Sequence, residues 1–322
     1  MTKHYITWWN IENLFDVHNS ENRPEWLAKE LKHELKGWTK DVLDKKLANL
    51  SSVIKQINDK QGPDIFGFCE VESKTVAQKL CDRLDIANRD YRLIHKDTKD
   101  NRGIDIAFIY DANKYTVDEE NIFSYEVIKR SSTRDILQIS FTTVKGNELI
   151  IIGNHWPARS AGQYKSEPYR IIAGETLSYW LKRIQEIKGK NAAVVVMGDF
   201  NDEPYSRSLT EYALSSMNRK KVIYGRNPYL YNLMWQLLGE RKSSYVFNSE
   251  PLMIDQFLVS KGIVIKNGTF RIKDNPVKID SFQDMTKGRY FTPVRFGRPS
   301  SKRTFNQNGF SDHLPVSFLL FE

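Results

Sequence analysis

Six segments of the sequence bring together carboxylates, amides and imidazoles. They are Trp9–Asn13, Glu70–Glu72, Asn154–Pro157, Gly198–Asp202, Asp255 and Gly309–His313. Carboxylate oxygens suit Mg²⁺ or Mn²⁺, and such an ion can neutralise the charge that builds on a phosphate during displacement. Asparagine and protonated histidine donate hydrogen bonds to phosphate oxygens, and an aspartate can position or deprotonate water. Each segment alone resembles an ordinary turn or cap, so the signal is their ordered combination, which indicates metal-assisted phosphoester hydrolysis.

Apolar runs that look like strands precede or contain most of these segments. We expect strands at Tyr5–Trp9, Asp64–Cys69, Tyr91–His95, Ile104–Tyr110, Asn121–Ile128, Ile136–Thr142, Glu148–Gly153, Ala192–Met197, Met253–Val259 and Leu314–Phe321. Strand ends of stacked sheets can converge on one rim. Six such ends would then supply one site rich in acids, amides and imidazoles.

Helical spacing is clearest in Thr39–Ile57, where apolar residues recur at three- and four-residue steps and Thr39 suits an N-cap. Thr75–Leu84 is a second expected helix. A third begins at Ser166 or Glu167 and ends at Ile184, with Pro168 in its first turn. Glu203–Ser206 is expected to turn into a fourth helix.

Strands outnumber helices, and no repeat or linker divides the chain. Gly225–Glu250 is aromatic-rich and shows no clear pattern. Two packed sheets covered by helices use this set of elements economically. We therefore predict one domain over residues 1–322.

The composition is that of a globular protein, with 40% hydrophobic and 27% charged residues and a net charge of +8. No run approaches the ~18 apolar residues of a membrane span, and the first residues show no signal peptide. We therefore expect a cytoplasmic protein without stable membrane association. The two cysteines, Cys69 and Cys81, and the scattered histidines argue against a disulfide framework and a zinc site.

The net charge is unevenly distributed along the chain. Lys266–Arg303 contains ten Lys or Arg and three Asp, a surplus of seven. A basic stretch with aromatic neighbours suits a polyanionic partner, although a solvated face would look the same in sequence. We expect this stretch to bind the polyanion beside the site, with Arg295, Arg298, Lys302 and Arg303 each contacting a phosphate.

Taken in order, the six segments resemble the endonuclease/exonuclease/phosphatase superfamily. That superfamily includes DNase I-like nucleases, inositol polyphosphate phosphatases and sphingomyelinases. The resemblance spans Tyr5 to Phe321, and its most specific parts are Gly198-Asp-Phe-Asn201 and Ser311-Asp-His313. It implies an α/β fold, a four-layer α/β/β/α sandwich of two packed mixed β-sheets flanked by helices, with the site at one rim.

The resemblance also implies a role for each matching position. Glu70 would be the principal ligand of Mg²⁺ or Mn²⁺, and the further groups near the metal or the phosphate would be Asn10, Glu12 and Asp312. The proposed catalytic residues are Asp199 for the attacking water, Asn201 for the scissile phosphate, His313 as a transition-state donor, Asp255 to orient that ring, and His155 to assist the leaving oxygen or the phosphate.

Two departures from the superfamily's patterns narrow the substrate class. Met253-Ile-Asp-Gln256 replaces the Trp-x-Asp-Arg typical of inositol polyphosphate phosphatases. His155-Trp-Pro157 replaces the tyrosine and asparagine usual in the apurinic-site branch. Together with the basic Arg159, which we place against phosphate, this segment is similar to bacterial nucleases. We predict a phosphodiester hydrolase, a nuclease that acts on DNA or RNA by in-line attack of water.

Two other functions stay open at this point. A lipid or small-molecule phosphodiesterase similar to sphingomyelinases would need an exposed aromatic hairpin, and Tyr229–Trp235 is the only candidate. A catalytically inactive nucleic-acid-binding module would be expected to lack a motif residue. The sequence does not separate DNA from RNA, endonuclease from exonuclease action, or one metal from two. The oligomeric state is also open.

Overall fold

Two large mixed sheets stack face to face in the computed structural model, which describes residues 1–159, 162–240, 242–297 and 305–322. The six-stranded sheet has the order β14 (Val277–Ile279), β17 (Val316–Phe321), β1 (Lys3–Leu14), β2 (Ile65–Val71), β4 (Asp105–Asp111) and β3 (Tyr91–His95). The seven-stranded sheet has the order β5 (Tyr115–Tyr125), β6 (Ile136–Thr143), β7 (Glu148–His155), β8 (Val194–Asp199), β13 (Asp255–Val259), β10 (Leu230–Asn232) and β9 (Ser215–Ser216).

Helices and short hairpins complete the described part of the chain. The α-helices are α1 (Glu25–Leu31), α2 (Lys40–Gln56), α3 (Lys74–Cys81), α4 (Gln163–Lys188), α5 (Arg219–Tyr224), α6 (Trp235–Gly239) and α7 (Lys261–Val264), and Ser208–Tyr212 forms a π-helix. The two small hairpins are β11 (Tyr245–Phe247) with β12 (Glu250–Leu252), and β15 (Thr286–Lys287) with β16 (Thr292–Pro293). No helix among these residues is long and apolar enough to cross a membrane.

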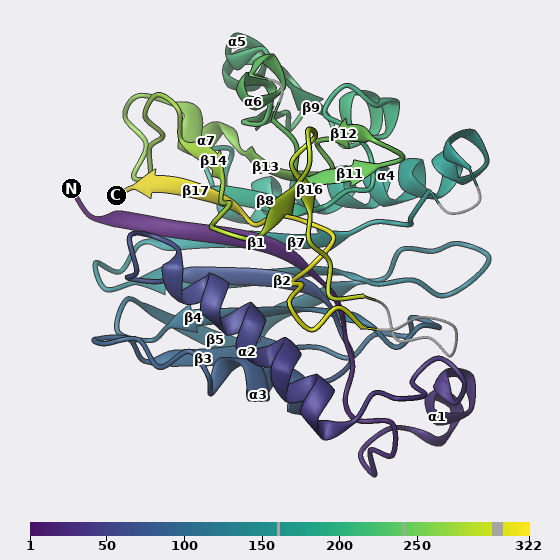
Figure 1. The fold of residues 1–322 in the computed structure, drawn as a ribbon. Helices are drawn as coiled ribbons and strands as arrows, with labels where there is room; N and C mark the ends of the chain where they lie inside the picture. The colour runs from purple at the N-terminus through teal and green to yellow at the C-terminus, as the bar shows by residue number, and fades with distance from the viewer. Residues whose placement is uncertain (160–161, 241, 298–304) are drawn as a thin grey trace.

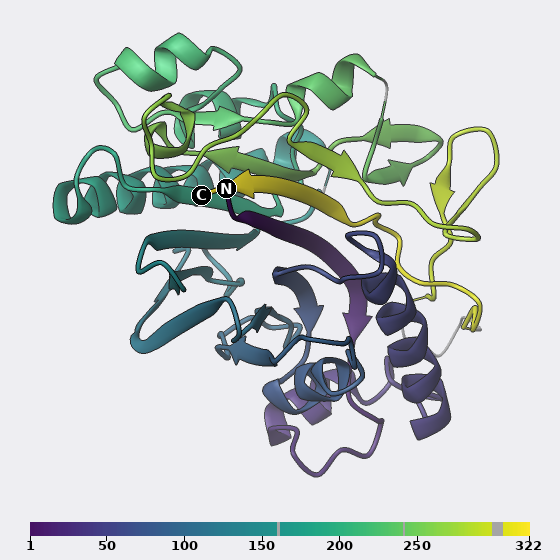
Figure 2. The same cartoon turned by 90° about the vertical axis from the view of Figure 1, so that its left-hand side faces the viewer.

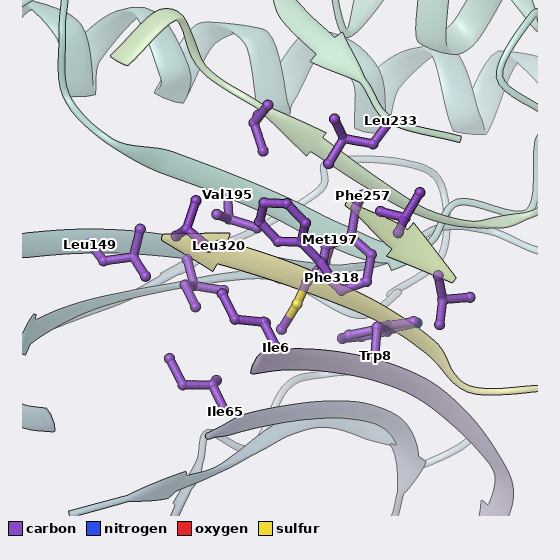
Figure 3. Close-up of a cluster of buried hydrophobic side chains, with 14 of the residues drawn as sticks. Ile6, Trp8, Ile65, Leu149, Val195, Met197, Leu233, Phe257, Phe318 and Leu320 are labelled. Carbon is purple, nitrogen blue, oxygen red and sulfur yellow. The ribbon is translucent and has the colours of Figure 1, made fainter. Parts of the chain in front are cut away.

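Alternation along the central strands builds a core between the sheets. In β1, Ile6 and Trp8 enter this core while Trp9 points to the opposite face. In β8, Val195 and Met197 do the same from the other sheet. Figure 3 shows Ile6, Trp8, Val195 and Met197 between the two sheets. Because side chains of a strand alternate between faces, an unbroken apolar run such as that of β8 must be covered on both sides.

Helices cover the two outer faces of the sheets (Figure 1). The α2 side chains Leu43, Leu47 and Leu50 pack in the same cluster as Trp9, on the outside of the six-stranded sheet. On the outside of the other sheet, α4 contributes a second apolar layer. Thr39 caps α2 by accepting from the Val42 N–H. The four-layer α/β/β/α sandwich predicted from the sequence is therefore confirmed.

Strand directions place the sequence motifs at one rim. β1 runs parallel to β2 in one sheet, and β7 runs parallel to β8 in the other. His155 at the end of β7 lies 3.8 Å from Glu70 near the end of β2, so these four strands end on the same side of the stacked sheets. β17 returns antiparallel to β1, which brings Thr2 and Glu322 together at the other rim, where the two termini lie side by side (Figure 2). The residues that follow β1, β2, β7 and β8 therefore face one another.

Three local expectations need correction. β5 begins at Tyr115 rather than Asn121, because Tyr115 is buried and pairs with Thr143, although the acidic residues that follow hide the strand in the sequence. α4 begins at Gln163, so Pro168 lies inside the helix rather than in its first turn. The irregular segment 225–250 contains β10, α6 and β11.

A buried ion-pair network at the rim opposite the motifs gives a stability prediction. Arg89 pairs with Asp64 and with Asp111 Oδ2 at 2.8 Å, and all three side chains are buried. Arg89→Met leaves Asp64 with Lys114, 2.8 Å away, and removes the Arg89 partner of Asp111, so we expect the free energy of unfolding to fall by about 3 kcal/mol, as for other broken buried pairs. Urea denaturation measures this change.

The matched control is Arg92→Met. Arg92 lies 3.1 Å from Asp90 in a pair whose side chains are about half exposed, and such pairs contribute roughly 0–1 kcal/mol. Equal unfolding midpoints for the Arg89 and Arg92 variants would contradict the buried network.

Candidate active site

A β-bulge aims the first acid of the rim. The register of β2 against β4 shifts between Cys69 and Val71, and Glu70 occupies the bulge with φ 68°. An extra residue in a strand re-aims its side chain, and a left-handed glutamate is uncommon. Glu70 Oε2 accepts from the Asn13 N–H at 2.9 Å. Glu70 Oε1 lies 3.6 Å from Arg102 Nη2, so the carboxylate faces a cation across the rim.

The charge on Glu70 is maintained in spite of burial. Burial alone would raise its pKa, but Arg102, His313 and Arg134, with the Asn13 N–H, outweigh burial and hold the pKa below its ordinary value. Glu70 is therefore ionised at neutral pH, which is the state that a metal ligand needs.

Asp199, the last residue of β8, lies at the centre of the rim. Its Oδ2 accepts from Asn10 Nδ2 at 3.0 Å, and its Oδ1 accepts from the Asn201 N–H at 2.9 Å. His155 Nε2 and His313 Nε2 lie 3.8 and 3.9 Å from the same Oδ2. These gaps are too long for direct hydrogen bonds. A water or phosphate oxygen placed there would meet an aspartate and two imidazoles.

Burial raises the pKa of Asp199 to about 6, with Asp255 acting in the same direction and His313 against it. A carboxylate with a pKa near neutrality is a stronger base than an exposed one and is still ionised at pH 7. Asp199 is therefore suited to accept a proton from water.

His313 is the cationic member of the rim. Its Nδ1 lies 2.7 Å from Asp255 Oδ2, and Trp8 Nε1 donates to the other oxygen of Asp255 at 3.2 Å. Burial opposes the charge on the ring, but Asp255, Asp199 and Asp312 raise the pKa of His313 to about 10. Because Asp255 holds Nδ1, the protonated Nε2 faces the rim. The Tyr245 ring stacks on the imidazole with centroids 4.5 Å apart.

The second histidine of the rim is neutral. Burial, together with Arg134 and Arg102, lowers the pKa of His155 well below its ordinary value. Its Nε2 lies 3.8 Å from Glu70 Oε1 as well as from Asp199. Within the described chain its Nδ1 is buried without a hydrogen-bond partner. The two imidazoles therefore differ in charge, which suits different tasks at one phosphate.

The oxygen donors around Glu70 fit a hard divalent cation. The Asp312 carboxylate is about one quarter exposed and close enough to Glu70 for the two charges to repel, since Glu70 contributes to the raised pKa of Asp312. The Asn10 amide oxygen accepts only the Glu12 N–H among the described residues and keeps a free lone pair. Mg²⁺ is typically held by one or two carboxylates with water completing the shell. Burial raises the pKa of the Cys69 thiol well above its ordinary value.

The Glu12 carboxylate is bound by donor groups of the protein itself. It accepts from Arg295 Nε at 2.7 Å and from the N–H groups of Phe296 and Gly297. It therefore fixes the segment after β16 and has no evident capacity left for a metal. Arg295 also lies 3.3 Å from Asp312, so this arginine does reach the rim.

The other predicted basic contacts fall into three groups. Arg159 donates to the Asn201 carbonyl at 2.6 Å and pairs with Asp202, so it braces the loop that carries Asn201. Arg298, Lys302 and Arg303 lie outside the described residues. The first part of the basic stretch lies away from the site, because the backbone of Arg271 forms an antiparallel β-bridge with Phe321 at the opposite rim. The basic stretch is therefore not one continuous surface beside the site.

Sequence reasoning missed several residues of the site. Arg102 donates to Asn13 Oδ1 at 3.0 Å beside Glu70. Arg134 donates to the Trp156 carbonyl next to His155. Tyr245 lies in the segment without a clear pattern. Their partners are remote in sequence, so no local pattern could identify them.

The link between Asp255 and His313 predicts a pH effect. Asp255→Asn removes the first of the charges that raise the His313 pKa, so that pKa should fall by about one unit or more. If the cation is the active form, activity is present below the pKa and lost as pH rises through it. The alkaline limb of the kcat profile should therefore move toward neutrality in the variant. Identical alkaline limbs in the two proteins would contradict this coupling.

A four-layer sandwich whose rim carries these acids, amides and histidines defines the DNase I-like class of fold. The chain belongs to the endonuclease/exonuclease/phosphatase family, because the sequence model of that family matches residues 5–322. Members of this family hydrolyse phosphoesters.

Solved structures with this fold cover almost the whole chain at low identity. An endonuclease/exonuclease/phosphatase family protein from Bacteroides thetaiotaomicron is 15% identical, with a TM-score of 0.58 over 100% of this chain and 96% of its own. The human Nocturnin catalytic domain with bound sulfate is 17% identical, with a TM-score of 0.54 over 99% and 94%. A mannosyl-6-phosphatase from B. thetaiotaomicron is 15% identical, with a TM-score of 0.56 over 99% and 100%. No curated protein matches the chain in sequence.

Proposed function

We propose that this protein is a divalent-metal-dependent phosphodiester hydrolase and that its substrate is DNA or RNA. The observation that carries the proposal is the position of Asp199 Oδ2, held by Asn10 and flanked at 3.8 and 3.9 Å by a neutral and a cationic imidazole. An oxygen atom placed between these groups would adjoin a base, a hydrogen-bond donor and a second imidazole. Such groups can serve the hydrolysis of a phosphoester.

The chain's own residues perform the proton and charge steps. Asp199 orients the attacking water and accepts its proton as the new bond to phosphorus forms in line with the leaving oxygen. His313 donates from Nε2 to a phosphate oxygen, where negative charge develops. Asn201, whose amide donates to the Trp156 carbonyl at 3.0 Å, is held beside Asp199 for the same phosphate. As that bond forms, the bond from phosphorus to the leaving oxygen breaks and the leaving oxygen takes a proton from solvent water. The products are a phosphomonoester and an alcohol.

Glu70, Asp312 and Asn10 are the proposed holders of Mg²⁺ or Mn²⁺, which when bound neutralises charge on the phosphate. Glu70 is ionised, and its Oε1 is 3.6 Å or more from the nearest cation and imidazole. Glu12 is left out of this set because its carboxylate accepts from Arg295, Phe296 and Gly297.

Neither of two rival functions gains support from the sequence feature by which it was to be recognised. Tyr229–Trp235, the candidate for a lipid-contacting hairpin, forms β10 and the start of α6, and β10 is paired on both sides within the large sheet. An inactive module would lack a motif residue, whereas every motif position is present in the sequence.

A substrate panel tests the proposal. Purified protein with Mg²⁺ or Mn²⁺ should be offered plasmid, single-stranded DNA, RNA, sphingomyelin and a sugar phosphate. We expect hydrolysis of at least one nucleic acid, with loss of that activity in Asp199→Asn. Turnover of sphingomyelin or the sugar phosphate alone would overturn the nuclease assignment.

A further inference from the structure

Two short hairpins lie beside the rim, and each is connected directly to a residue that contacts the rim. The β11–β12 hairpin begins at Tyr245, whose ring stacks on His313 and whose backbone bridges to the same residue. The β15–β16 hairpin leads directly into Arg295, which pairs with Glu12 and Asp312. β11 packs against β16, and both views show the hairpins side by side (Figures 1 and 2).

Large aromatic side chains stand exposed on these hairpins. Phe247 lies two residues beyond Tyr245, on the same face of β11, and is 54% exposed. At the tip of the β15–β16 hairpin, Tyr290 is 43% and Phe291 72% exposed. Phe291 also has φ 51°, a conformation that bulky residues rarely adopt. Neither core packing nor turn preference accounts for a phenylalanine at that position.

Positive charge accompanies these rings. Lys287 and Arg289 are exposed on the β15–β16 hairpin, and neither forms an ion pair with another described residue. The Arg289 guanidinium lies 5.9 Å from the centre of the Tyr290 ring. Aromatic faces interleaved with free cations form the surface that single strands use, because bases stack on the rings while cations meet the phosphates.

We infer that the β11–β12 and β15–β16 hairpins form a stacking platform for the unpaired bases of a single-stranded nucleic acid, which they hold beside the phosphate at His313. The inference rests on the proposed function and narrows its substrate to single strands. A duplex keeps its bases stacked on one another, so it offers no free base faces to Phe247 and Phe291. The direct contact of Tyr245 with His313 joins the platform to the reaction centre.

Binding of oligothymidylate is the first test. Fluorescence anisotropy of a labelled strand measures the Kd. Phe247→Ala and Phe291→Ala should each raise the Kd at least about fivefold, the lower end of a base-stacking contact. The control is Tyr224→Ala, which removes an 81% exposed ring from α5 and should leave the Kd unchanged. Binding of the matching duplex should be insensitive to all three changes.

The salt dependence tests the charges separately. Lys287→Ser combined with Arg289→Ser should flatten the slope of log K against log salt by about 1.4, at about 0.7 per contact with a single strand.

Turnover of bis-p-nitrophenyl phosphate separates this inference from the proposed function. This small diester reaches the rim without needing the hairpins, so the Phe247 and Phe291 variants should retain wild-type turnover of it. If the wild-type protein hydrolyses no phosphodiester, the proposed function fails. If it does, but the two phenylalanine variants bind oligothymidylate as Tyr224→Ala does, the platform is wrong. Loss of binding to phosphatidylcholine–sphingomyelin vesicles, with unchanged oligothymidylate binding, would instead assign the hairpins to a membrane.

Discussion

Asp199→Asn should lower kcat by at least about 10²-fold on the substrate that the wild-type protein hydrolyses, the usual scale of general-base assistance. The amide keeps the shape of the side chain and its contact distance to Asn10, which is 3.0 Å in the wild type, but it cannot accept a proton from water. Steady-state kinetics at saturating metal measures the loss. Substrate binding should persist, because the phosphate contacts of the other residues are retained.

The pH profile adds an independent check on Asp199. Burial raises its pKa to about 6, and only the ionised form is a base, so wild-type kcat should fall as pH drops through that value. Glu203→Gln is the matched control, since Glu203 lies four residues away and its carboxylate accepts from Tyr205. A kcat for Asp199→Asn equal to that of this control would place the base elsewhere.

His313→Ala should cost roughly 10²–10³ in kcat, the loss seen when one preorganised donor to a developing oxyanion is removed. The ring is held by Asp255 at 2.7 Å and by stacking on Tyr245, so the donor is positioned before substrate arrives. KM should change far less than kcat, because the contact strengthens only as charge develops on the phosphate.

A surface histidine provides the comparison for His313. His18 is exposed and contacts the Lys32 carbonyl, and His18→Ala should behave as the wild type. Asp255→Ala should cost less than His313→Ala, because Asp255 acts through the ring. Equal kcat values for the two histidine variants would remove His313 from the proposed mechanism.

The sequence was sufficient to predict the architecture because the composition and alternation of the strands can be recognised in it. β8 is apolar at every position from Val194 to Met197, and such a run must be covered on both faces. The order of the motifs at strand ends then predicts a common rim, and the structure brings Asn10, Glu70, Asp199 and His313 together there.

Features that depend on register and on remote partners were beyond sequence reasoning. The bulge that aims Glu70 is a shift of β2 against β4, and nothing in Cys69-Glu-Val71 encodes it locally. Glu12 pairs with Arg295, which lies 283 positions away, so its carboxylate could not be separated from the metal ligands by pattern alone. The hairpins that flank His313 are only two or three residues per strand and carry no periodicity to detect.

Metal titration of the wild-type protein against Glu70→Gln tests the central claim most directly. Protein treated with EDTA should hydrolyse no phosphodiester, and Mg²⁺ or Mn²⁺ should restore activity along a saturable curve. Glu70→Gln keeps the size of the side chain but removes the charge, so its midpoint should lie at a metal concentration at least about tenfold higher, with a lower maximum rate. Full activity in the metal-free wild type, or superimposable titrations of the two proteins, would contradict metal-assisted hydrolysis at this rim.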